Sequence, residues 1–279
     1  MRFLCINMRI QTKEDKIMKK IAVVLMALSL VFVSALSLAD AATLDSVKAA
    51  GTLVIATSPD FPPFESMQGD GSIVGIEIDV MNAVADALGV SLTIEPVNFD
   101  SILLGVMSGS YDVGVSGFSV TEERKKNVLF TDAYCLAAQA IVVPEGSAIA
   151  AKADLEGKTV SVQSGTTAEL FCLENGYTVD AYNTNSDAEM AVLSGSVDAW
   201  VIDDLTAAQM VKANNAGGGK QLVILPDAMT TEPYAFAFAF GSEDLCSAVN
   251  DVVNGMVADG TIAALFEKWD APYTTPAAE

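Results

Sequence analysis

The chain has 279 residues, 51% of them hydrophobic, and carries 36 acidic against 15 basic residues, for a formal net charge of −21. So acidic a chain repels nucleic acid and anionic membrane surfaces, and we expect neither as a partner. Histidine is absent, which excludes histidine-based zinc sites, the usual general base and every Ser/His/Asp arrangement.

The start of the chain has the pattern of an export segment. Met18-Lys-Lys20 precedes an apolar run over residues 21–33, and small residues follow up to Ala39 and Ala41. The run is shorter than the roughly 20 residues that span a bilayer. We therefore predict a signal peptide over residues 1–41, with translation starting at Met18 and cleavage near Ala39 or Ala41, and a soluble, periplasmic mature chain.

Strand-like apolar runs then alternate with amphipathic helical runs. The first series is expected as strand 52–56, helix 79–88, strand 92–97, a helix from about 100, and strand 111–115. The second is expected as strand 159–163, helix 168–174, strand 177–182, helix 187–193 and strand 197–202. Such βαβαβ series predict open parallel sheets, and therefore an α/β fold with two Rossmann-like lobes.

A late segment, 234–240, alternates aromatic residues with alanine and is followed by two helical patterns. We expect it to return to the first lobe, so that residues 42–138 and 232–279 form lobe 1 and residues 139–231 form lobe 2. The chain would then cross between the lobes twice, which predicts a two-stranded hinge.

Arg124 is the only arginine after the export segment. The preceding residues offer the Ser119 hydroxyl and a predicted helix start, with Thr121 as N-cap and Glu122 and Glu123 in the first turn. A guanidinium, a hydroxyl and the free N–H groups of a helix start together suit a carboxylate. The alternative, a surface arginine paired with Glu122 or Glu123, stays open.

Asp203 comes at the end of a predicted strand of the second lobe. Ser116 and Gly117 occupy the equivalent position after a strand of the first lobe. Ligands of open parallel sheets bind beyond the carboxyl ends of the strands, so we expect these residues to face one another across a cleft. An aspartate there suits an ammonium group. The alternative is that Asp203 caps the following helix, a role that Asp204 also suits.

Two further features bear on a binding site. The turn from Gln163 to Thr167 offers hydroxyl and N–H donors, and the aromatic residues Phe61 and Phe99 follow strands of the first lobe. Either aromatic residue would serve as the wall of a ligand site or as a core residue.

The cysteines of the mature chain lack a CxxC pair and are expected as core residues, with one disulfide as the alternative.

Several spaced motifs resemble the polar amino-acid family of bacterial solute-binding proteins that feed ABC importers. They are Asp60-Phe-Pro-Pro-Phe64, Gly75-Ile-Glu-Ile-Asp-Val80, Ser119-Val-Thr-Glu-Glu-Arg124, Phe130-Thr-Asp132, Gln163-Ser-Gly-Thr-Thr167, Val197-Asp198, and Asp259-Gly-Thr261 before Phe266-Glu-Lys-Trp269. The resemblance implies the periplasmic binding protein type II fold and a monomer that binds a free L-α-amino acid for a membrane permease. It implies no cofactor, no metal and no enzymatic activity.

The resemblance also assigns roles. Arg124 matches the arginine that binds the ligand carboxylate, with Ser119, Ser116 or Gly117, and Thr167 as supporting donors. Asp203 matches the ammonium-binding aspartate, and Phe61 and Phe99 match the aromatic walls. Ser58 and Gln163 lie where members differ with the ligand side chain.

Relatives that prefer cationic ligands often carry an acid where this chain has Ser58, which favours a neutral polar or moderately apolar amino acid, although Glu65 could compensate. Two alternatives to import share the scaffold: a receptor that presents its ligand to a sensor or chemotaxis partner, and an enzyme resembling cyclohexadienyl dehydratase.

Overall fold

The structure of the protein is a computed structural model that describes residues 41–226 and 229–276. The predicted signal peptide, apart from Ala41, lies outside the described residues. Within those ranges, no helix combines the length and the apolar character needed to cross a membrane.

Two five-stranded sheets have the same arrangement. In the first, β1 pairs in parallel with β5 and β6, and β15 is inserted antiparallel between β6 and β7. In the second, β10 pairs in parallel with β11 and β12, and β9 lies antiparallel between β12 and β13. The first sheet consists, in order, of β5 (Ser91–Pro96), β1 (Thr52–Thr57), β6 (Val113–Gly114), β15 (Ala237–Ala239) and β7 (Val128–Phe130). The second consists of β11 (Thr178–Tyr182), β10 (Thr159–Gln163), β12 (Ala199–Asp203), β9 (Gln139–Pro144) and β13 (Leu222–Ile224).

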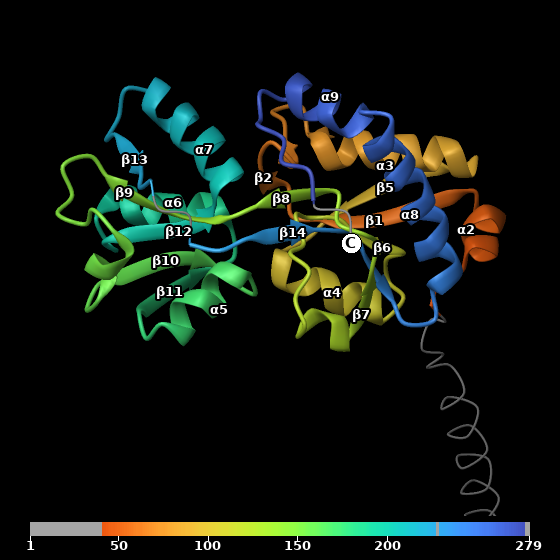
Figure 1. Ribbon diagram of the computed structural model, residues 1–279, viewed down its shortest axis with the longest axis horizontal. Coiled ribbons are helices and arrows are strands. Elements are labelled where there is room, and N and C mark those ends of the chain that lie inside the picture. The colour runs from red at the N-terminus through yellow and green to blue at the C-terminus, as the bar shows by residue number, and fades with distance from the viewer. Residues whose placement is uncertain (1–40, 227–228, 277–279) are drawn as a thin grey trace, which may run out of the picture. The chain divides into compact units, whose positions relative to one another are not determined.

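Helices cover both faces of each sheet (Figure 1). On the first sheet, α3, α8 and α9 pack together on one face and α4 packs on the other. On the second sheet, α6 and α7 lie on one face and α5 on the other. The bounds are α2 (Leu44–Ala50), α3 (Ile76–Leu88), α4 (Phe99–Met107), α5 (Thr167–Glu174), α6 (Asn185–Ser194), α7 (Asp204–Ala216), α8 (Glu243–Ala258) and α9 (Thr261–Lys268).

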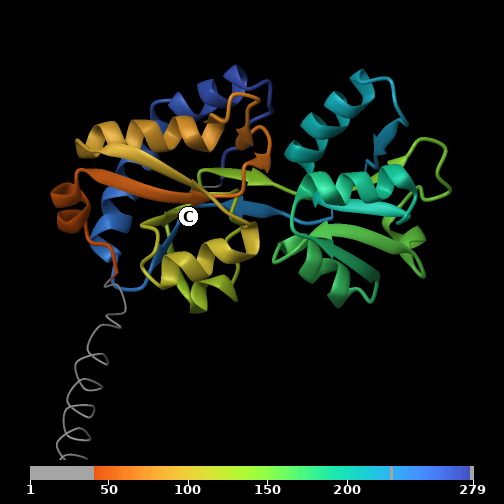
Figure 2. The ribbon, with the colours of Figure 1, turned by 180° about the vertical axis from the view of Figure 1, so that it is seen from behind.

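Two strands connect the lobes. β8 (Cys135–Ala137) and β14 (Glu232–Tyr234) pair antiparallel in a sheet of their own, with Cys135 opposite Tyr234. Both views of the ribbon show this pair between the two large sheets (Figures 1 and 2). The predicted fold class, two Rossmann-like α/β lobes joined by a two-stranded hinge, is confirmed.

A small sheet and two 3₁₀ turns complete the described structure. The sheet joins β2 (Asp60–Phe61), β3 (Glu65–Met67) and β4 (Ile73–Val74) and leads into α3. The turns are η2 (Arg124–Lys126) and η3 (Lys152–Leu155).

The predicted helix after Thr121 is wrong in type and length. The chain there forms only η2, and β7 begins two residues after it, at Val128. The Thr121 hydroxyl nevertheless accepts a hydrogen bond from the Arg124 N–H at 3.1 Å. Because β7 begins only seven positions after Thr121, a single tight turn fits between them.

The cysteines in the described part of the chain are buried and unpaired, as expected for core residues. Burial raises the pKa of the Cys172 thiol to about 12 and that of Cys246 to about 11. Because the thiolate is the reactive form, both thiols are chemically inert in the folded protein.

Candidate functional site

A narrow pocket, partly open to solvent, takes its lining from both lobes. Nine of the ten site residues predicted from the sequence line it: Phe61, Phe99, Ser116, Gly117, Ser119, Arg124, Gln163, Thr167 and Asp203. The tenth, Ser58, lies one hydrogen bond behind the pocket, where its Oγ accepts from Gln163 Nε2 at 3.2 Å. The strand ends of the two sheets thus meet at one pocket.

Arg124 is held at the boundary between the lobes. Its Nη1 donates to the backbone oxygen of Ser119 at 3.0 Å, and its Nη2 donates to that of Gly165, in the other lobe, at 3.2 Å. The guanidinium carbon lies 5.5 Å from the Phe99 ring centroid and 5.3 Å from that of Phe118. Two of the five guanidinium donors are used within the described residues, which leaves donors for an anion in the pocket.

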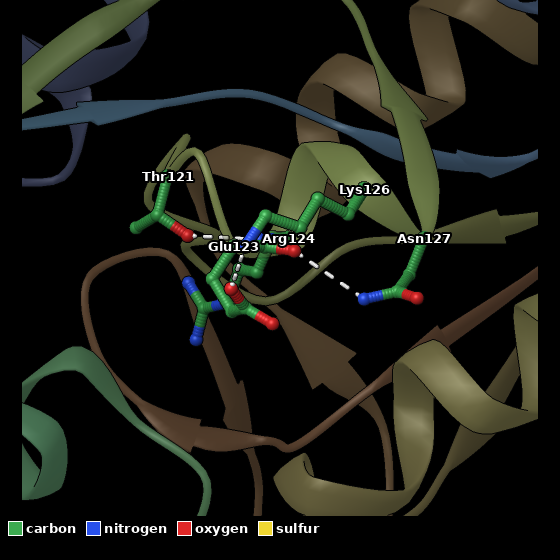
Figure 3. A network of polar contacts seen from close by, with 5 residues as sticks. All are labelled: Thr121, Glu123, Arg124, Lys126 and Asn127. Atoms are coloured by element: carbon green, nitrogen blue, oxygen red, sulfur yellow. Dashed lines mark hydrogen bonds and ion pairs between the residues drawn. The ribbon is translucent and has the colours of Figure 1, made fainter.

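The alternative reading of Arg124, as a surface arginine paired with a neighbouring glutamate, is wrong. Glu122 pairs with Lys125 at 3.0 Å, and Glu123 pairs with Lys126. Figure 3 shows the contacts of Glu123 with Lys126 and Asn127, and no contact joins Glu123 to the Arg124 guanidinium. Burial lowers the pKa of Arg124, although the negative charge of Asp203 opposes this effect.

Asp203 is buried at the end of β12 and does not cap α7 with its side chain. Its carboxylate accepts hydrogen bonds from Gln139 Nε2 and from the Tyr234 hydroxyl. Asp204 instead accepts from the Leu205 N–H at 2.8 Å. Burial, followed by the negative charge of Glu232, raises the pKa of Asp203 to about 7. A cation in the pocket would therefore stabilise the ionised form.

The first turn of α5 also faces the pocket, through Thr166, Thr167 and Ala168. The first N–H groups of a helix have no partner within the helix, and the helix dipole favours an anion there. Thr167 Oγ1 lies 3.4 Å from Ser119 Oγ, so a hydroxyl of lobe 2 contacts a hydroxyl of lobe 1. The N-terminus of α5, these hydroxyls and Arg124 form a group of anion-binding donors.

Amide side chains form another part of the lining. Asn185 Nδ2 donates to Gln163 Oε1 at 2.9 Å, and Gln163 Nε2 donates to Ser58 Oγ. The Ser58 hydroxyl in turn donates to Asp60 Oδ1 at 3.2 Å. Asp60 Oδ2 accepts from the Asn185 N–H at 2.5 Å and from the Ser186 N–H, so a carboxylate of lobe 1 binds the N-terminus of α6 in lobe 2.

Phe61 and Phe99 are both pocket walls and core residues. Phe61 stacks on Phe64, and Phe99 stacks on Phe118, with 9% and 8% of their surfaces exposed. Gly117 lies against Phe61 with φ 54°, where a Cβ atom would come within 2.5 Å of the Phe61 ring. Only glycine fits that position without displacing the aromatic wall.

Ser116 and Gly117 line the pocket, but their donors point away from it. The Ser116 hydroxyl donates to Glu65 at 2.7 Å, and the Gly117 N–H donates to Glu77 at 3.0 Å. Both glutamates are buried and absent from the pocket lining. Glu65 is therefore not placed to compensate for the neutral Ser58 in binding a cationic ligand.

Sequence reasoning missed three polar residues of this region. Gln139 and Tyr234 bind Asp203, and Asn185 lines the pocket. Gln139 and Tyr234 belong to β9 and β14, at the crossings between the lobes. Segments that cross between two lobes lie at the base of the cleft. The crossings predicted near residues 138 and 232 could therefore have indicated Gln139 and Tyr234.

The charged groups of the pocket differ in sign. Among the described residues, no three acidic or cysteine side chains gather in a way that would hold a metal ion. One cation and one anion instead line one pocket, with neutral polar and aromatic groups around them.

Comparisons with known proteins agree with this architecture. Residues 53–271 match the model of the bacterial extracellular solute-binding proteins, family 3. The L-cystine-binding protein TcyJ of Escherichia coli K12 is 33% identical over 249 residues, which cover 88% of this chain and 92% of TcyJ.

Two solved structures share the type II fold. A mutant of ArgBP from T. maritima has a TM-score of 0.77 and 36% identity, covering 81% of this chain and 98% of ArgBP. The ancestral amino acid-binding protein AncCDT-1, a precursor of cyclohexadienyl dehydratase, has a TM-score of 0.75 and 35% identity, covering 82% and 99% of the two chains. The chain belongs to the bacterial extracellular solute-binding proteins of family 3.

Proposed function

We propose that this chain is the exported substrate-binding component of an amino-acid ABC importer and that it holds one free L-α-amino acid in the pocket. The observation that carries the proposal is that Arg124 and Asp203 line the same pocket from different lobes. A free α-amino acid presents a carboxylate and an ammonium group on one carbon. TcyJ is named as an L-cystine-binding protein, and ArgBP from T. maritima has been solved bound to arginine, which supports the same class of ligand.

The ligand carboxylate would bind on the Arg124 side. The remaining guanidinium donors, the Ser119 and Thr167 hydroxyls and the N-terminus of α5 all offer hydrogen bonds to an anion. Each charge-assisted hydrogen bond contributes about 1.5 to 3 kcal/mol. These donors come from both lobes, so the carboxylate would bridge them.

The ligand ammonium would bind Asp203. Gln139 and Tyr234 fix the carboxylate of this aspartate, and the remaining lone pairs suit an N–H donor. The positive charge would offset the cost of ionising a buried aspartate.

The side chain of the ligand would lie between the aromatic walls and reach the amides of Gln163 and Asn185. Ser58 is neutral, Asp60 is bound to backbone N–H groups, and Glu65 points to Ser116. These contacts favour a neutral polar side chain, such as that of glutamine, over a cationic one. An amide can both donate to and accept from Gln163 and Asn185.

Closure would follow from contacts that exist only when the lobes meet. A ligand shifts an opening equilibrium only through its differential affinity for the two states. The lobes already share the bonds of Arg124 with Gly165, Gln163 with Ser58 and Asp60 with α6. A ligand that bound both Arg124 and Asp203 would add to these contacts and favour the closed state, which a permease would recognise.

The ligand is tested by thermal unfolding against the twenty amino acids, because a compound that binds only the folded state raises its melting temperature. We expect L-glutamine to stabilise the protein more than L-arginine. Arg124→Ala should weaken binding of the best amino acid at least tenfold by calorimetry, the loss of about 1.4 kcal/mol. Lys126→Ala, which removes an exposed cation of the same turn, should leave the affinity within twofold. Equal affinities for the two variants would refute the carboxylate assignment.

The import role is tested in cells. Deletion of the gene should abolish uptake of the labelled amino acid. Intact uptake with a lost chemotactic response would favour the receptor alternative, and turnover of prephenate or arogenate by the purified protein would favour the dehydratase alternative.

A further inference from the structure

Two glutamates lie side by side beneath the pocket. Glu65 belongs to β3 and Glu77 to the first turn of α3, and both are fully buried. Neither lines the pocket, so binding of an amino acid by Arg124 and Asp203 leaves them without a role. An isolated buried charge is costly, and such groups are expected to be paired or neutral.

The backbone brings the two glutamates together. Gly75 passes so close to Phe64 that a Cβ atom on it would lie 2.0 Å from the Phe64 carbonyl oxygen. Beyond this glycine, the Glu77 N–H donates to the same carbonyl oxygen at 3.1 Å. The start of α3 is thereby fixed against the residue that precedes Glu65.

In the described part of the chain, the donors around the pair leave one carboxyl oxygen without a partner. Glu77 accepts from the Gly117 N–H at 3.0 Å and from the Tyr134 hydroxyl at 2.6 Å, and Glu65 Oε1 accepts from the Ser116 hydroxyl at 2.7 Å. Glu65 Oε2 is buried and has no donor among the described residues. Ser116 and Gly117 are adjacent in the chain, so the bonds to them place the two carboxyl groups next to each other. Two carboxylates only accept, so this contact forms when Glu65 is protonated and donates to Glu77.

The surroundings of the pair favour the same assignment. The titratable groups that face it are Asp60, Tyr134 and Cys135, which are acids or neutral groups. Burial, followed by the negative charge of Glu77, raises the pKa of Glu65 well above its ordinary value. Burial also raises the pKa of Glu77, but the hydrogen bonds from Glu65, Tyr134 and Gly117 oppose this effect.

We infer that Glu65 and Glu77 share one proton and act as positioning residues that hold the Ser116–Gly117 turn in the shape that the ligand pocket requires. The inference rests on the proposed function, since it assigns this turn to the ligand site. Glu65 orients the Ser116 hydroxyl so that its oxygen accepts the Ser58 N–H at 3.1 Å. Glu77 holds Gly117 against Phe61, and the pair thereby fixes an aromatic wall.

The inference predicts different effects for two variants of equal size. In Glu65→Gln, the side-chain NH₂ group can replace the shared proton, and its oxygen still accepts from Ser116. In Glu77→Gln, one acceptor oxygen is lost while Gly117, Tyr134 and Glu65 still present donors. We therefore expect L-glutamine affinity at pH 7 to stay within about twofold in Glu65→Gln and to fall at least tenfold in Glu77→Gln.

The pH dependence supplies a readout that burial alone would not give. Because the pKa of Glu65 is raised in the folded state, its stabilising effect is complete below the unfolded pKa of about 4.3 and is lost as the pH rises through the folded value. Over that window the melting temperature of the ligand-free wild type should fall, relative to Glu65→Gln, by about 3 to 5 °C per pH unit. Glu95→Gln, at an exposed position, should follow the wild type.

Infrared spectroscopy detects the shared proton directly, without a measurement of affinity. At pH 6, above the ordinary pKa of glutamate, the infrared difference spectrum of wild type minus Glu65→Gln should contain the band of a protonated carboxyl group. Equal losses of affinity in the two variants, an unchanged melting profile in Glu65→Gln, or absence of the band would overturn the inference. Failure of every amino acid to bind would overturn the proposed function instead, because the melting profile and the infrared band need no ligand.

Discussion

Acidification should release the ligand through Asp203. The perturbation is a change from pH 8 to pH 5, across the pKa of about 7 that burial and Glu232 give this aspartate. Only the ionised aspartate pairs with the ammonium group. Arg124 also faces Asp203 but stays charged over this range, and the other facing groups are Glu232, Asp204, Tyr234 and Cys135.

The size of the effect follows from the ionised fraction of Asp203. The apparent dissociation constant is the intrinsic one divided by the fraction of competent protein. With a pKa of about 7, the apparent constant should rise about twofold at pH 7, about tenfold at pH 6 and about 100-fold at pH 5. Binding at pH 6 should release about 0.9 proton per ligand.

Calorimetry measures both quantities. The amino acid that stabilises the protein most is titrated at each pH, in buffers that differ in ionisation enthalpy, so that the heat reports the protons released. Asp203→Asn should bind more weakly at pH 8 and lose most of the pH dependence. A dissociation constant that stays level from pH 8 to pH 5, or proton uptake on binding, would refute the pairing of Asp203 with the ammonium group.

The same shift predicts an effect on stability without ligand. The folded pKa of Asp203 is raised, so its stabilising effect is present below about pH 3.9 and is lost as the pH rises through about 7. At pH 8 the cost is on the order of 4 kcal/mol. Asp203→Asn should therefore raise the melting temperature of the ligand-free protein more at pH 8 than at pH 5.

Two further substitutions test how the pocket is closed and shaped. Asp60→Ala removes the bonds to the Asn185 and Ser186 N–H groups, so we expect about five- to tenfold weaker binding and a larger ligand-free radius of gyration by X-ray scattering. Gly117→Ala places a methyl group 2.5 Å from the Phe61 ring at φ 54°, so we expect at least tenfold weaker binding and a loss of about 1 to 3 kcal/mol in unfolding free energy.

Each substitution has a matched control. Asp86→Ala removes an exposed carboxylate of α3 and should change neither affinity nor radius of gyration. Gly255→Ala adds a methyl group in α8, where no atom lies within 4 Å, and should be neutral or stabilising. If a control matched its test variant, the contact invoked for that variant would be irrelevant.

The sequence was sufficient where regular patterns determine structure. Strand ends of open parallel sheets gather at one edge, which is why Ser116, Gly117 and Asp203 were expected at one cleft and do line one pocket. Strand 159–163 was predicted with its observed bounds, because its alternating pattern is short and bounded by turn residues. The helix predicted from residue 79 begins three residues earlier, at Ile76, since Gly75 lets the helix start tightly against Phe64.

The rest depends on contacts between residues far apart in the chain. Nothing in the local sequence shows that Gln139 and Tyr234 bind Asp203, because these residues are 64 and 31 positions away from it. From the sequence alone, Glu65 could compensate for the neutral Ser58 in binding a cationic ligand. Its orientation is set by Ser116 and Glu77, 51 and 12 positions away, and only the packed fold supplies them.

The same interactions that form the pocket also hold the lobes together, and this links binding to closure. Arg124 donates to Gly165 across the lobes, and Gln163 donates to Ser58. Only β8 and β14 join the two lobes as paired strands in the described structure, so side-chain contacts such as these help to hold the lobes as observed. An amino acid between Arg124 and Asp203 would add charge-assisted contacts to these, which is the differential affinity that the proposed closure requires.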